Sequence, residues 1–257
     1  MTTAQIDWTI VGPAMLAGIL VLTTHVPLGQ EVLKRGIIFI DLAIAQIAGL
    51  GVIAADTFIG EAEGIIVQIS AVTAALLAAA GLNWTEKHWP RIQEPLIGIL
   101  FVLAATGSIL LLAENPHGGE YLKDLLVGQI LWSTWSSLIP ISVLYAILLI
   151  VWFTLKNKIG RIGFYITFSF AVTASVQLVG VYLVFASLII PGLATSQLQG
   201  NKRLFIGYLS GAFSYFIGIL LSSWLDLPTG AIIVWAMAVT GIMTGYIIKL
   251  SGSKNSH

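Results

Sequence analysis

One carboxylate stands well inside an apolar run of this sequence, and it is Asp41 in the segment GIIFIDLAIAQIAGLG. None of the other eleven acidic residues has such a position. An ionisable group inside a membrane is costly unless it faces a polar cavity or a partner, and by default it is functional. Asp41 therefore indicates a cation pathway or its gate. The plainer alternative is a hydrogen bond to a neighbouring helix.

His25 is the second residue whose type and position suit such chemistry. It stands near the end of the preceding apolar run, and it is the only one of the four histidines so placed. An imidazole binds metal ions and pairs with carboxylates. Asp41 and His25 are therefore the candidate metal-binding residues of a transport pathway. Alternatively, His25 caps a helix end or lies at the level of the lipid headgroups.

The neighbours of Asp41 are mostly small. If residues 36–55 form one helix, the residues that share the Asp41 face are Ala45, Ala48 and Val52. Such a narrow face suits close packing or the lining of a pathway. Gln46 lies roughly 140° round an ideal helix from Asp41, so we do not expect it to be a second ligand.

The composition requires a membrane protein. Hydrophobic residues make up 57% of the 257 residues and charged residues only 9%, which a soluble domain of this size could not carry on its surface. Basic and acidic residues number twelve each, so no nucleic-acid partner is expected. The absence of cysteine excludes disulfides and thiolate ligands. The N-terminal segment has no basic n-region, which predicts a retained first span.

The apolar runs predict about nine transmembrane helices, within a range of eight to ten. The runs of spanning length lie near 9–26, 36–55, 64–84, 95–113, 138–155, 204–222 and 229–249. The run 163–190 is flanked by basic residues on both sides, so we expect two short spans, 163–179 and 181–196, bent at Gly180.

This count places the N-terminus outside and the C-terminus in the cytoplasm. Eleven of the twelve basic residues then face the cytoplasm and only Lys123 lies outside, as the positive-inside tendency demands. Residues 27–36 and 85–94 become basic inner loops. Residues 121–137 fit no span and predict an interface-lying helix on the outer face or an ordinary packed loop.

Five segments, spread in order from about residue 25 to 245, resemble the permease subunits of zinc/manganese-type ABC importers. They are LGQEVLKRGIIFIDLAIAQIAGLG, QEPLIGILFVLAATGSILLL, LLVGQIL, VQLVGVYLVFASLIIPGLAT and LSSWLDLPTGAIIV. The resemblance implies an all-helical permease with a single transmembrane domain over residues 1–257, in the bacterial plasma (inner) membrane. It also implies a second copy of the chain as partner, cytoplasmic ATPase subunits that bind the ATP, and an extracytoplasmic metal-binding protein. Asp41 matches the pathway aspartate of that family.

Two departures from the family pattern affect these expectations. Many relatives have a histidine where this chain has Ala45, which shifts the expected cargo from zinc toward harder or chelated cations, unless His25 supplies the imidazole. The loop KNKIGR replaces a longer segment that docks on the ATPase in relatives. The ATPase is therefore expected to contact residues 27–36 and 85–94, or ATP hydrolysis is coupled to transport differently in this chain.

The leading hypothesis is the permease of an ATP-driven importer of zinc, manganese, iron or a metal chelate. The sequence has no P-loop, HExxH or CxxC motif, so no cofactor is expected in this chain, and the energy must come from a partner or an ion gradient. An ion-gradient carrier is the alternative, although it would need more intramembrane ionisable groups. An intramembrane enzyme is less favoured, because no catalytic pair shares a face.

Overall fold

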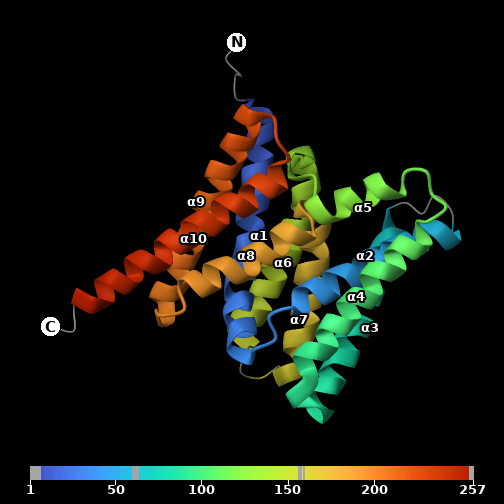
Figure 1. The fold of residues 1–257 in the computed structure, drawn as a ribbon, viewed down its shortest axis with the longest axis horizontal. Coiled ribbons are helices and arrows are strands. Elements are labelled where there is room, and N and C mark those ends of the chain that lie inside the picture. The colour runs from blue at the N-terminus through green and yellow to red at the C-terminus, as the bar shows by residue number, and fades with distance from the viewer. Residues whose placement is uncertain (1–6, 60–63, 156–157, 159, 255–257) are drawn as a thin grey trace. The chain divides into compact units, whose positions relative to one another are not determined.

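The computed structural model describes residues 7–59, 64–155, 158 and 160–254, and the described part is built from helices. The helices are α1 (Trp8–Arg35), α2 (Ile40–Ile59), α3 (Ile65–His88), α4 (Gln93–Leu111), α5 (Gly118–Val127), α6 (Trp135–Leu155), α7 (Gly160–Val179), α8 (Val181–Ala194), α9 (Gly200–Leu225) and α10 (Thr229–Lys254), with 3-10 turns η1 (Pro90–Ile92) and η2 (Ile130–Trp132). Figure 1 shows their course along the chain.

Eight of the described helices are long and apolar enough to cross a membrane, and α8 is a shorter apolar helix. The all-α polytopic fold is therefore confirmed. The predicted break at Gly180 is also present, since α7 ends at Val179 and α8 begins at Val181. Gly180 has φ 80°, a conformation that interrupts a helix and favours glycine.

The chain forms two compact units that are interleaved in sequence. The first comprises Met1–Arg35, Val127–Ala146 and Leu178–His257, and the second comprises Gly36–Leu126 and Ile147–Gln177. In the first unit α1, α8, α9 and α10 pack together, and in the second α2 packs against α3 and α4 (Figure 1). In the first unit α1 and α8 approach closely, because a Cβ at Gly29 would lie 1.9 Å from the Leu188 carbonyl oxygen.

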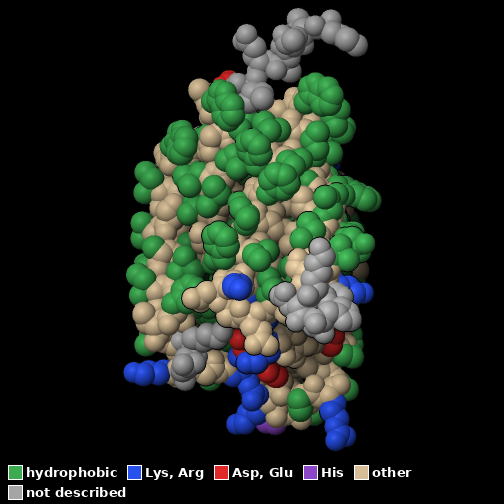
Figure 2. All heavy atoms as spheres, turned by 90° about the vertical axis from the view of Figure 1, so that its left-hand side faces the viewer, with side chains coloured by type: hydrophobic (Ala, Val, Ile, Leu, Met, Phe, Trp, Pro, Cys, Tyr) green, Lys and Arg blue, Asp and Glu red, His purple; other side chains and the backbone are tan. Residues whose placement is uncertain are grey.

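Large hydrophobic side chains are exposed along the spans, as contact with lipid requires. Hydrophobic side chains cover much of the face shown in Figure 2. The more exposed examples on α9 and α10 are Phe205, Trp224, Trp235 and Ile242.

The predicted inner loop at 27–36 is wrong, because α1 continues to Arg35. Lys34 and Arg35 occupy its last turn, where cations complement the helix dipole. Gly36, with φ 70°, ends the helix in the left-handed conformation typical of this position. The predicted start of the next helix at residue 36 is likewise wrong, since α2 begins at Ile40.

Residues 121–137 do not form one element. Their first part belongs to α5, which ends at Val127, and their last part begins α6 at Trp135. The 3-10 turn η2 lies between them. Neither an interface helix nor a packed loop describes the whole segment.

Candidate functional site

Asp41 lies in the first turn of α2, in the second unit, and is only 1% exposed. This is nearer the helix start than we predicted, because Gly36 and the turn after it are not helical. Neither carboxylate oxygen has a hydrogen-bond partner among the described residues. The backbone N–H groups of Asp41 and Leu42 are the polar groups that act on the carboxylate from its own turn. The Asp41 carboxylate is therefore buried without a side-chain hydrogen-bond partner among the described residues.

Glu94 lies beside this turn and comes from the first turn of α4. Its Oε1 accepts a hydrogen bond from the Phe39 backbone N–H at 3.2 Å, two residues before Asp41. Its Oε2 is buried without a partner among the described residues. The second unit thus brings two carboxylates together at the starts of α2 and α4.

Sequence reasoning missed Glu94 as a site residue. The segment QEPLIGILF contributed to the family resemblance, but Glu94 precedes its apolar run and looks like an ordinary acidic residue at a helix start. The one feature of the sequence that could have indicated Glu94 is its position at the start of a predicted span. The sequence could not show that Glu94 lies beside Phe39, because the two residues are 55 positions apart in the chain.

Gln46 is a third buried acceptor on α2. It is 2% exposed, and its Oε1 has no hydrogen-bond partner among the described residues. Ala45 and Ala48, on the predicted Asp41 face, are also buried, whereas Val52 is partly exposed. The buried acceptors of α2 and α4 that lack partners, namely those of Asp41, Gln46 and Glu94, are all oxygens.

His25 lies in α1, in the first unit, and is fully buried. It stands ten residues before the end of α1 at Arg35, so the helix-cap alternative is wrong. Its Nδ1 lies 2.9 Å from the Val21 carbonyl oxygen and 3.0 Å from the Thr24 hydroxyl. Donation from Nδ1–H to that carbonyl leaves Nε2 with a lone pair, and Nε2 has no partner among the described residues. This is the arrangement in which an imidazole binds a metal ion.

The structure describes Asp41 and His25 in different units, each buried with unused acceptor atoms. Among the described residues, no group of three or more histidine, aspartate and glutamate side chains is arranged to hold a metal ion. A cation bound by Asp41 and Glu94 would therefore keep other ligands, such as water.

The chain matches a family model described as the ABC 3 transport family, over residues 7–164 and 154–247. A relative from Thermotoga maritima, "Probable metal transport system membrane protein", is 30% identical, with 89% of this chain and 86% of that protein covered. "Probable iron transport system membrane protein" of Haemophilus influenzae is 26% identical, with 74% and 76% covered.

The fold also resembles a solved structure described as PsaBC from Streptococcus pneumoniae in complex with Fab. The TM-score is 0.73 at 21% identity, and the match covers 91% of this chain and 90% of that chain. At this identity the likeness bears on the fold. The all-helical arrangement is therefore shared with that structure.

Proposed function

Because the chain belongs to the ABC 3 transport family, we propose that it is the membrane permease subunit of an ATP-driven importer of a transition-metal cation or metal chelate. ATP binds to separate cytoplasmic ATPase subunits, and an extracytoplasmic metal-binding protein delivers the cargo. A second copy of this chain completes the membrane part. The proposed cargo is supported by the names of two relatives, which specify metal transport in Thermotoga maritima and iron transport in Haemophilus influenzae.

The observation that carries this proposal is the burial of the Asp41 carboxylate without a hydrogen-bond partner among the described residues. A carboxylate that is 1% exposed and has no hydrogen-bond partner among the described residues is costly to keep in a membrane span. The cost is offset when a cation binds, because a charged ligand pair replaces the lost hydration. Asp41 is therefore the residue that receives the metal, with Glu94 beside it.

The donor atoms favour manganese or ferrous iron over zinc. The buried acceptors on α2 and α4 that have no partner among the described residues are oxygens, which suit harder divalent cations, whereas zinc favours nitrogen and sulfur ligands. The position at which many relatives carry histidine is Ala45 here. The His25 Nε2 on α1 has no hydrogen-bond partner among the described residues. We propose that this imidazole binds the cargo at another stage of transport.

Uptake by the variant Asp41→Asn tests the proposal. This change preserves the shape of the side chain and removes its charge, so expression and assembly with the ATPase stay normal. Uptake of Mn²⁺ or Fe²⁺ into proteoliposomes falls at least about tenfold, because loss of a charged ligand costs about 1.5–3 kcal/mol. The measurement is ATP-driven uptake of each metal by the purified complex.

Asp56→Asn is the matched control, since Asp56 lies on the same helix near its other end. Its uptake stays close to that of the wild type. Asp41→Leu separates a structural role from a transport role. Wild-type uptake by Asp41→Asn together with failed assembly of Asp41→Leu would show that Asp41 only holds the fold.

A further inference from the structure

We propose that Tyr208 is a positioning residue for His25, because its hydroxyl supplies the hydrogen bond that Pro27 cannot make in the turn of α1 that carries the imidazole. This inference rests on the proposed function in one respect, since it assumes that His25 binds the cargo. The contact itself lies within the first unit, to which α1, α8 and α9 belong. It can therefore be tested without transport.

Pro27 lies inside α1 and interrupts the hydrogen bonds of its backbone. Proline has no N–H, so the bond that is missing from the helix is the one to the carbonyl four residues earlier. That carbonyl belongs to Thr23. Because His25 stands between Thr23 and Pro27, the turn that carries the imidazole is the turn that lacks a helical bond.

Tyr208 of α9 provides a substitute for the missing bond. Its hydroxyl donates to the Thr23 carbonyl oxygen at 3.0 Å, from a residue 185 positions along the chain. In membrane spans, groups on neighbouring helices commonly satisfy the backbone groups that a proline leaves free. The turn of His25 is therefore stabilised by a contact between two helices.

The packing of α1 against α9 keeps Tyr208 in this place. Three contacts follow one another at every fourth residue of both helices, and they join Gly18 to Tyr215, Leu22 to Gly211 and Val26 to Gly207. A Cβ added at each of these glycines would lie between 2.3 and 3.0 Å from the partner side chain. The two helices therefore have no room to slide, and the last of these contacts directly precedes Pro27 and Tyr208 in the two helices.

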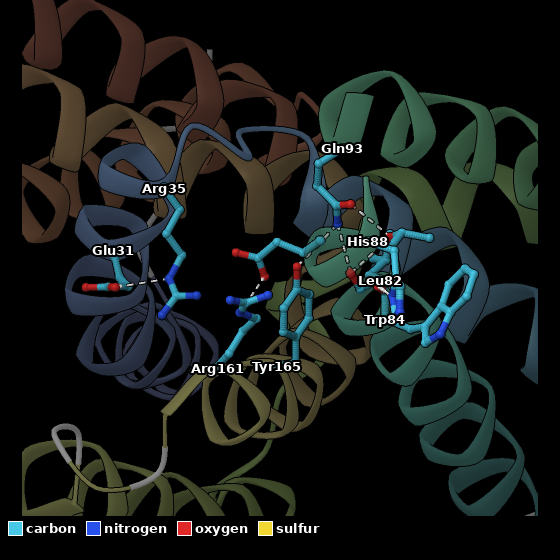
Figure 3. A network of polar contacts seen from close by, with 10 residues as sticks. Glu31, Arg35, Leu82, Trp84, His88, Gln93, Arg161 and Tyr165 are labelled. Atoms are coloured by element: carbon cyan, nitrogen blue, oxygen red, sulfur yellow. Dashed lines mark hydrogen bonds and ion pairs between the residues drawn. The ribbon is translucent and has the colours of Figure 1, made fainter. Parts of the chain in front are cut away.

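Beyond Pro27, α1 packs closely against α8. A Cβ at Gly192 would lie 3.0 Å from the Leu33 side chain, and one at Gly29 would meet the Leu188 carbonyl oxygen. Glu31 and Arg35 form an ion pair at 3.0 Å across the last turns of α1 (Figure 3). The part of α1 after Pro27 is thus fixed separately from the part that packs against α9. The turn that contains His25 joins the two parts.

The direction of the His25 imidazole depends on this turn. Its Nδ1 lies 2.9 Å from the Val21 carbonyl oxygen and 3.0 Å from the Thr24 hydroxyl, which both belong to α1. Its Nε2 has no hydrogen-bond partner among the described residues. If the turn opens, Nδ1 loses these contacts and Nε2 changes direction. Tyr208 therefore acts on cargo binding through His25 and is not itself a ligand.

The test measures how fast diethyl pyrocarbonate modifies His25 in the purified, detergent-solubilised chain, by mass spectrometry of its peptides. Tyr208→Phe keeps the ring and removes the hydroxyl. Modification of His25 and amide hydrogen exchange at residues 24–28 are therefore expected to become about two- to tenfold faster, as the loss of one hydrogen bond predicts. Tyr246→Phe is the matched control and keeps the wild-type rates, because it removes a hydroxyl from an exposed residue of α10.

Pro27→Ala separates the positioning role from a general effect of Tyr208 on stability. Alanine at this position restores the N–H that bonds to the Thr23 carbonyl in a regular helix. Tyr208→Phe combined with Pro27→Ala is therefore expected to keep both rates close to those of Pro27→Ala alone, which is a non-additive result. An equal increase with and without Pro27→Ala, or no increase for Tyr208→Phe alone, would overturn the inference.

Uptake of Mn²⁺ by the complex in proteoliposomes connects the contact to the cargo. Tyr208→Phe is expected to raise KM about threefold or more with an unchanged maximal rate, and the added Pro27→Ala is expected to restore KM. Wild-type uptake by Tyr208→Phe, together with a more reactive His25, would overturn the positioning role and leave the proposed function standing. A wild-type complex that takes up no metal would overturn the proposed function, while the rates of His25 modification would still report the contact.

Discussion

Two aspartates at helix starts behave in opposite ways. Asp7 precedes α1, and its Oδ1 accepts hydrogen bonds from the Thr9 N–H at 2.9 Å and the Thr9 hydroxyl at 2.6 Å. This is the usual capping role of the residue type. Asp41 begins α2 and has no hydrogen-bond partner among the described residues. A capping role therefore accounts for Asp7 and leaves the burial of Asp41 unexplained, which supports a role for Asp41 in binding the cargo.

The cap at Asp7 predicts a pH-dependent helix start. The side-chain hydrogen bond from Thr9, and then its backbone N–H, lower the pKa of Asp7 below its ordinary value of 3.8. A lowered folded-state pKa means that the stabilisation is present above 3.8 and is lost as the pH falls through the folded-state value. Amide hydrogen exchange of Thr9, corrected for the intrinsic rate, is therefore expected to speed up in that acidic range. Asp7→Asn should show no such step, and an identical step in that variant would refute the role of the carboxylate.

At the scale of elements, backbone segments of the first unit touch at three glycines, Gly128, Gly180 and Gly230, which together are called the node. A Cβ at Gly128 would lie 2.2 Å from the Val179 carbonyl carbon, and one at Gly180 would lie 2.3 Å from the Gly128 nitrogen. A Cβ at Gly230 would lie 2.2 Å from the Val127 carbonyl oxygen. The end of α5, the break between α7 and α8 and the start of α10 are thus joined without side chains between them.

The node predicts a strong effect of Gly180→Ala on stability. The positive φ of 80° costs about 1–3 kcal/mol for a residue with a Cβ, and the added Cβ would also clash with the backbone of Gly128. Gly160→Ala is the matched control, because Gly160 has φ 57° but no atom within 4 Å of the added Cβ. Thermal unfolding of the detergent-solubilised protein should show a clearly larger loss of Tm for Gly180→Ala. Equal losses would mean that the close contact contributes nothing.

Local signals in the sequence predicted most of the helices, but they predicted less of how these helices pack against one another. Hydropathy marks spans because lipid must meet apolar side chains, and the basic flanks of 163–190 predicted the break at Gly180. The motifs LLVGQIL, VQLVG and DLPTG were visible separately, but their meeting at one node depends on packing between segments far apart in the chain. The burial of Asp41 could be predicted, whereas its proximity to Glu94 could not, for the same reason.

At the scale of the whole molecule, the division into two units was not visible in the sequence. The chain passes between them after Arg35, Leu126, Ala146 and Gln177, so neither unit is a continuous segment that composition could mark. Glycines with positive φ, namely Gly36, Gly128 and Gly180, lie close to three of these crossings. The fourth crossing lies inside α6, which continues from one unit to the other. Hydropathy alone reports spans and not the groups that they form.

The last prediction concerns membrane topology. Lys158 precedes α7 and Lys202 lies in the first turn of α9, and both are exposed. If α7 and α8 cross the membrane as a pair, both lysines lie in the cytoplasm, as the positive-inside tendency favours. The native chain has no cysteine, so Lys158→Cys, Lys202→Cys and Lys123→Cys each give a single labelling site without background. With an impermeant thiol reagent, intact cells should label only Lys123→Cys, and the other two should react after the membrane is opened. Labelling of just one of Lys158→Cys and Lys202→Cys in intact cells would place them on opposite faces and rule out the paired crossing at Gly180.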